Sequence, residues 1–141
     1  TTISLSACSD ITDMSALQNL PEGQVTMTLR SMEGSVLLAG MADENGTISS
    51  IKTLTINNCA GSEFDQNIQS LPNLERLEIN NSKFVDLPEW VASSDKLTYV
   101  DLRYNALTDI PTALLNLSNL ETLVLSYNST LTDSDADKRI D

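Results

Sequence analysis

Carboxylates are the side chains of this chain that could do acid–base chemistry, because its 141 residues include no histidine. The absence of histidine excludes Ser-His-Asp and Cys-His catalysis and any metal site built on imidazole. Glu78 and Asp101 lie 23 residues apart at equivalent, outward-facing places of a repeated pattern, and close carboxylate pairs can hydrolyse glycosides. Arg76 and Arg103 lie within diagonal reach on the same face. We therefore expect a solvated charge network rather than a catalytic pair, and no enzymatic activity.

A run of alternating carboxylates near the C-terminal end suggests a metal site. Asp133, Asp135 and Asp137 have the spacing that opens a calcium-binding loop, but Lys138 stands where that loop needs a glycine. We interpret residues 129–141 as an acidic tail, and we expect no metal and no other cofactor.

The two cysteines are candidates for a disulfide. Cys8 and Cys59 occupy the same position of repeats that are two apart, and a rise of about 4.8 Å per repeat would separate them by about 9.6 Å. A disulfide needs Cα atoms within about 7 Å of each other. We therefore expect two unbridged, buried thiols with a structural role.

A repeat with a period of 23 residues in its regular part sets the positions of the paired carboxylates and of the cysteines. Each of four copies has aliphatic residues at its first, fourth and sixth positions and Cys, Ser or Asn at its ninth. Two weaker copies precede them, so that six rungs start near residues 1, 24, 51, 74, 97 and 120. Alternating aliphatic residues predict a short strand in each copy, and such a strand needs neighbouring copies to complete its core.

The pattern L-x-x-L-x-L-x-x-N/C-x-L resembles that of the leucine-rich repeat family. The Leu-Pro and Ile-Pro pairs that end at Pro88 and Pro111 make it similar to the 23-residue repeats of Ras-group proteins. The resemblance implies an α/β solenoid of about six rungs in a single domain over residues 1–141. It also implies a parallel sheet on the concave side and short helical or irregular returns on the convex side.

The resemblance further implies a ladder of buried polar side chains at the ninth position, which satisfy backbone groups in the turn after each strand. Met32 departs from this ladder and marks the second rung as irregular, and residues 43–47 are interpreted as an insertion loop on the convex side of that rung. The expected ladder residues are Cys8, Cys59, Ser82, Asn105 and Asn128.

The family resemblance implies that partners bind to outward side chains of the concave face. All three tyrosines and three of the four arginines lie at such positions, and Tyr and Arg are strongly enriched at binding hot spots. The alternative is a merely solvated strand face, on which Tyr104 and Tyr127 would simply cover the turns after their strands. The expected partner-binding residues are Arg76, Glu78, Tyr99, Asp101, Arg103, Tyr104 and Tyr127.

These features together predict a non-catalytic module that recognises another protein or a peptide through its concave face. Two alternatives stay open: the recognition part or ectodomain of a larger enzyme such as a receptor kinase, and a structural cell-surface repeat. The formal net charge of −12 disfavours nucleic acid, which rewards clustered positive charge. The longest strictly apolar run, residues 36–39, is too short to insert across a membrane.

The ends of the array and the compartment give weaker expectations. Neither end carries a recognisable cap, which predicts either a fragment of a longer array or self-association through the uncapped ends.

Low lysine content with abundant Ser, Thr and Asn favours an extracellular or cell-surface location, with a cytoplasmic one as the alternative. In a secretory pathway, Asn45 and Asn116 would be the accessible glycosylation sites. Trp90 is expected to pack against the convex returns, with a partner contact as the alternative.

Overall fold

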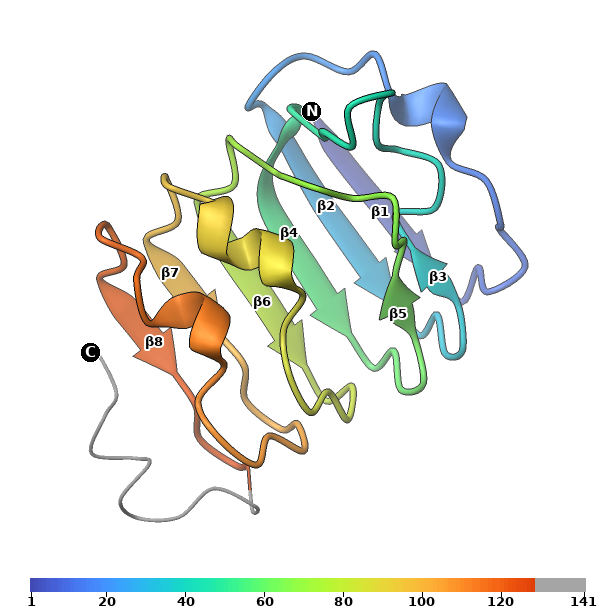
Figure 1. The fold of residues 1–141 in the computed structure, drawn as a ribbon. Helices are drawn as coiled ribbons and strands as arrows, with labels where there is room; N and C mark the ends of the chain where they lie inside the picture. Colours follow the sequence, from blue (N-terminus) through green and yellow to red (C-terminus); the bar gives the residue numbers. More distant parts are fainter. Residues whose placement is uncertain (129–141) are drawn as a thin grey trace.

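Six parallel strands form the main sheet, in the order β1-β2-β4-β6-β7-β8. The computed structural model describes residues 1–128, so the expected acidic tail and its carboxylate run lie outside the described residues. Figure 1 shows the strands side by side in chain order, with every return crossing the same face of the sheet. This arrangement confirms the predicted solenoid. The strands are β1 (Thr2–Ser6), β2 (Val25–Arg30), β4 (Ile51–Asn57), β6 (Arg76–Asn80), β7 (Tyr99–Asp101) and β8 (Thr122–Val124).

The strands from β4 to β8 pair in the register that the 23-residue repeat predicts. Leu77 lies opposite Leu54 on one side and opposite Val100 on the other, and Val100 lies opposite Leu123. Side chains that are 23 residues apart therefore form straight columns across the sheet. These columns bring residues that are distant in the sequence into direct contact.

A β-bulge interrupts this regular register between β2 and β4. Val25 pairs with Ile51, whereas Thr26 pairs with Thr53, so Lys52 is the extra residue. A bulge places two residues of one strand opposite one of its neighbour and bends the strand locally. The bulge absorbs one residue of the longer step between the second and third rungs.

The returns on the convex side are short helical turns or extended segments. Proline precedes two of them: Pro88 has φ −61° and Pro111 has φ −56°, the values to which the pyrrolidine ring restricts the chain. A second, two-stranded parallel sheet joins the returns of the second and third rungs, which the sequence did not predict. The elements are the 3₁₀ helices η1 (Ser15–Leu17), η2 (Glu89–Ser93) and η3 (Thr112–Leu114) and the strands β3 (Val36–Leu37) and β5 (Glu63–Phe64).

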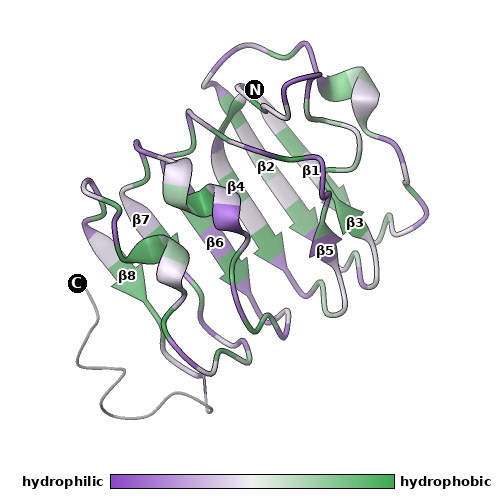
Figure 2. Cartoon of the chain, in the orientation of Figure 1, coloured by the Kyte–Doolittle hydropathy of each residue, from purple (hydrophilic) through white to green (hydrophobic). Residues whose placement is uncertain are grey.

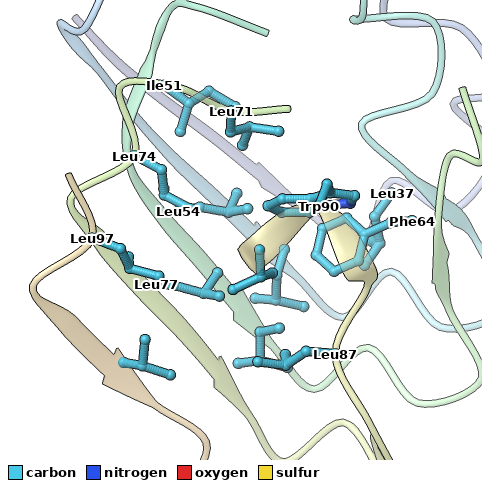
Figure 3. Close-up of a cluster of buried hydrophobic side chains, with 14 of the residues drawn as sticks. Leu37, Ile51, Leu54, Phe64, Leu71, Leu74, Leu77, Leu87, Trp90 and Leu97 are labelled. Carbon is cyan, nitrogen blue, oxygen red and sulfur yellow. The ribbon is translucent and has the colours of Figure 1, made fainter. Parts of the chain in front are cut away.

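The core lies between the main sheet and the returns. Figure 2 shows hydrophobic residues alternating with polar ones along the strands, as one buried face requires. Leu54 and Leu77 are fully buried and extend from the strands toward Leu87 and Trp90 of the returns (Figure 3). Full burial of one such leucine stabilises the fold by about 1.5–3 kcal/mol.

Trp90 packs in this core, as predicted. Its side chain is 7 % exposed, and its ring meets that of Phe64 edge to face, with centroids 5.4 Å apart and an interplanar angle of 89°. Edge-to-face contact is a favourable arrangement for aromatic rings. Among the described residues, the indole Nε1 of Trp90 has no hydrogen-bond partner.

Candidate functional site

The turn that follows each strand of the main sheet contains a residue in the left-handed backbone region. Asn tolerates this conformation well, whereas other residues with a Cβ are strained in it. The sequence analysis missed this column, although two asparagines directly before the ladder position are its signature. The column consists of Ala7 (φ 56°), Ser31 (φ 54°), Asn58 (φ 57°), Asn81 (φ 53°), Tyr104 (φ 60°) and Tyr127 (φ 62°).

The ladder residue that follows each of the last turns holds it in place. The Asn105 amide donates to the carbonyl oxygens of Ile79 at 2.6 Å and Leu102 at 2.9 Å. Its Oδ1 accepts from the backbone N–H groups of Ser82 at 3.1 Å and Phe84 at 3.3 Å. Asn105 therefore links two consecutive rungs and satisfies backbone groups that would be costly to bury unpaired.

Asn128 and Ser82 occupy the same place in their own rungs. Asn128 donates to the carbonyl oxygens of Leu102 at 2.8 Å and Leu125 at 2.9 Å. The hydroxyl of Ser82 accepts from the N–H of Cys59 at 3.0 Å. Both residues are buried, so the strand ends of the last three rungs are fixed by side chains inside the solenoid.

The two cysteines differ from each other in burial. Both are unbridged, and Cys59 is buried, but Cys8 is only half-buried. The expectation of two buried thiols is therefore wrong for Cys8, because β1 is the first strand of the sheet and has only β2 beside it. Burial raises the pKa of the Cys59 thiol, so this residue stays protonated and unreactive near neutral pH.

Arg76, Glu78 and Tyr99 form the first part of the expected partner-binding surface, on β6 and β7. The Nη2 of Arg76 lies 3.2 Å from Oε1 of Glu78, and Oε2 of Glu78 accepts from the hydroxyl of Thr55 at 3.2 Å. The guanidinium carbon of Arg76 lies 3.7 Å from the ring centroid of Tyr99, which is a cation–π contact. The hydrogen bond to Glu78 raises the pKa of Arg76 above its ordinary value.

Asp101 departs from the expectation of an outward, solvated carboxylate, because its side chain is 0 % exposed. Arg103 covers it: Nη2 lies 2.7 Å from Oδ2 of Asp101, and Nε donates to the same oxygen at 3.0 Å. The backbone N–H of Arg103 also donates to Oδ1 at 3.1 Å. The register had placed Asp101 on the correct face, but long neighbouring side chains fold over it. The hydrogen bonds to Asp101 raise the pKa of Arg103.

Each carboxylate of the Glu78–Asp101 pair thus has its own arginine. We call Arg76, Glu78, Tyr99, Asp101 and Arg103 the charge network. An acid–base pair for glycoside hydrolysis needs two carboxyl groups that face a shared substrate, whereas the side chain of Asp101 is covered. The geometry is that of a fixed polar surface.

Tyr104 and Tyr127 form a second feature beside the network, which we call the tyrosine pair. Their rings stack at 4.4 Å between centroids with an interplanar angle of 1°. Tyr104 is 52 % exposed and Tyr127 is 67 % exposed. The structure therefore brings together all seven residues expected in the partner-binding surface, five in the charge network and two in the adjacent tyrosine pair.

The two expected glycosylation sites both lie on the surface. Asn45 is exposed in a turn where Oδ1 of Asp43 accepts from the N–H groups of Asn45 at 2.8 Å and Thr47 at 3.0 Å. Asn116 is exposed in the return that follows η3. Their use as acceptors stays a prediction.

A hollow of about 550 Å³ lies on the convex side of the molecule, and its lining includes Phe64, Pro88, Glu89 and Trp90. It lies away from the expected partner-binding residues, none of which lines it.

Within residues 1–128, no group of three or more Cys, Asp or Glu side chains is arranged to hold a metal ion. No helix in this part of the chain is long and apolar enough to cross a membrane.

The fold and the ladder define a solenoid repeat protein, in which each rung has one strand and one return. Residues 72–130 match the family model described as leucine rich repeat. The matched segment covers the last three rungs, which are therefore leucine-rich repeats, and the earlier rungs continue the same parallel sheet. No curated protein matches the chain.

Proposed function

We propose that this chain is a non-catalytic recognition module that binds another protein or a peptide on its concave face. Leucine-rich repeats are generally interaction modules, and residues 72–130, which match their model, include every residue of the charge network and the tyrosine pair. The network and the pair lie on neighbouring strands and turns, so one partner segment can contact both.

The observation that carries the proposal is the conformation of the tyrosine pair. Tyr104 and Tyr127 hold bulky side chains in the left-handed region, with φ of 60° and 62°, where Asn58 and Asn81 show that asparagine serves the same turn. The turn itself does not require tyrosine. Backbone strain of this kind concentrates at functional sites, and exposed tyrosine is enriched at binding hot spots.

The charge network supplies a rigid neighbour for the tyrosine pair. Arg76 is held by Glu78 and by the ring of Tyr99, and Arg103 is held by Asp101 at three donor groups. Side chains that are ordered before binding lose less conformational entropy on association. The network therefore favours affinity through preorganisation.

Selection from a random peptide display library tests the proposal, with the immobilised chain as bait. We expect selected peptides to lose at least about 10-fold in affinity for the double variant Tyr104→Asn/Tyr127→Asn, because a hot-spot side chain contributes about 2 kcal/mol. The matched control is Leu115→Ala on the convex side, where Leu115 is 61 % exposed.

Binding that survives the double tyrosine variant would contradict the proposal. So would a selection that yields no peptide above background, or peptides that depend on Leu115 instead. Circular dichroism of each variant would show that the solenoid remains folded.

A further inference from the structure

We infer that the segment bound at the tyrosine pair is a basic peptide, with a lysine or arginine side chain on the ring face of Tyr127 that Tyr104 does not cover. This inference rests on the proposed function and names the chemistry of its partner. Three features of the concave face support it: the state of its arginines, the charge around it and the exposed aromatic rings.

The two arginines of the charge network are already paired with carboxylates. Arg103 has its Nε and Nη2 on Oδ2 of the buried Asp101, at 3.0 and 2.7 Å. Arg76 has its Nη2 on Glu78 at 3.2 Å and its guanidinium plane on Tyr99. A carboxylate or phosphate on the partner would meet guanidinium groups whose charge an internal carboxylate already balances. An acidic segment is therefore a poor fit for this surface.

The chain as a whole is acidic. The chain carries 20 Asp and Glu against 8 Lys and Arg. Glu75 and Glu121 directly precede β6 and β8, at the other end of the strands from the tyrosine pair, and Glu121 is exposed. Glu78 keeps 22 % of its side chain exposed within the network. A field of this sign attracts cationic segments and accelerates their association.

The exposed tyrosine rings provide a binding site for a cation. Aromatic faces carry negative electrostatic potential and attract ammonium and guanidinium groups. The chain itself uses this contact between Arg76 and Tyr99, at 3.7 Å. In the tyrosine pair each ring covers one face of the other, and the 67 % exposure of Tyr127 leaves its second face for a partner.

The peptides selected above provide the test. We expect Lys and Arg to be enriched in them over the unselected library, and we expect the affinity of a synthetic peptide to fall when salt rises from about 50 to 500 mM. Replacement of one basic residue by glutamine should lower the affinity for the wild-type chain about 3- to 30-fold, as expected for loss of a cation–π contact.

Two variants at the same position make the test specific. Tyr127→Phe keeps the aromatic face and should bind the peptide within about 3-fold of wild type. Tyr127→Asn removes the face, and with this variant the glutamine replacement should cause little further loss, because the two changes remove the same contact.

The failure of this inference can be told from the failure of the proposed function. Neutral or acidic peptides that lose affinity for Tyr104→Asn/Tyr127→Asn would overturn the basic partner and leave the concave binding face intact. Binding that is unaffected by the tyrosine variants, or a selection without any bound peptide, would overturn both.

Discussion

At the scale of single residues, the tyrosine pair stands out because its backbone conformation favours asparagine, whereas the residues at these two positions are tyrosines. Two turns of the same column have asparagine, which suits a φ near 55°, and two have tyrosine. Sequence alone could place Tyr104 and Tyr127 on outward positions, since the repeat fixes their register. The asparagines of the same column indicate the left-handed φ, but the stacking could not be predicted, because it depends on how consecutive turns lie against each other.

The stability of Tyr104→Asn distinguishes a binding role from a turn-covering role. Relief of left-handed strain, about 1 kcal/mol, should offset the loss of stacking, about 0.5–1.5 kcal/mol. We expect urea denaturation to show a free energy of unfolding within about 1 kcal/mol of wild type. A loss of more than about 3 kcal/mol would indicate that Tyr104 is needed to cover its turn.

The ion pair between Asp101 and Arg103 gives a second prediction at this scale. Arg103→Ala leaves the fully buried carboxylate of Asp101 without its partner and should lower the free energy of unfolding. The loss should be smaller than for a wholly buried pair, because the Arg103 side chain is 44 % exposed. Adding Asp101→Asn to the variant removes the buried charge and should restore part of the stability.

Urea denaturation of the single and double variants measures this coupling. Additive losses in the double-mutant cycle would contradict the view that Arg103 neutralises Asp101. The burial of Asp101 itself could not be predicted from sequence, because an outward register position becomes covered only when long side chains such as Arg103 and Tyr99 fold over it.

At the scale of elements, the strands followed from the 23-residue period, because alternating aliphatic residues can bury one face of a strand only in that register. The ladder was an implication of the resemblance to leucine-rich repeats. The β3–β5 sheet and the bulge at Lys52 did not follow. Both arise where the second rung departs from the repeat, and the pairing of two-residue strands depends on stacking between rungs rather than on local sequence.

Asn105→Ala tests the importance of the ladder. Its amide makes hydrogen bonds to backbone groups of both its own rung and the preceding one, and their loss leaves buried polar groups unpaired. We expect a loss of about 2–4 kcal/mol in urea denaturation. Thr108→Ala, at an exposed position three residues later, is the control and should change stability by less than about 0.5 kcal/mol. Equal effects of the two substitutions would argue against a structural ladder.

At the scale of the whole molecule, the solenoid separates two surfaces of different character. The convex side carries the returns, the core aromatic residues and an open hollow. The concave side carries the ordered charge network and the exposed tyrosine pair on the strands and turns of the last three rungs. The proposed function requires that the partner binds to the concave side and not to the convex side.

Titration of the ¹⁵N-labelled chain with a selected peptide, followed by amide chemical shifts, tests this requirement most directly. We predict that the largest changes in amide chemical shift occur in β6, β7 and β8 and in the turns at Tyr104 and Tyr127. The amide chemical shifts of Leu87 and Glu89, on the convex side, should stay unchanged. Shifts concentrated around the convex hollow, with the tyrosine turns unaffected, would contradict concave-face recognition.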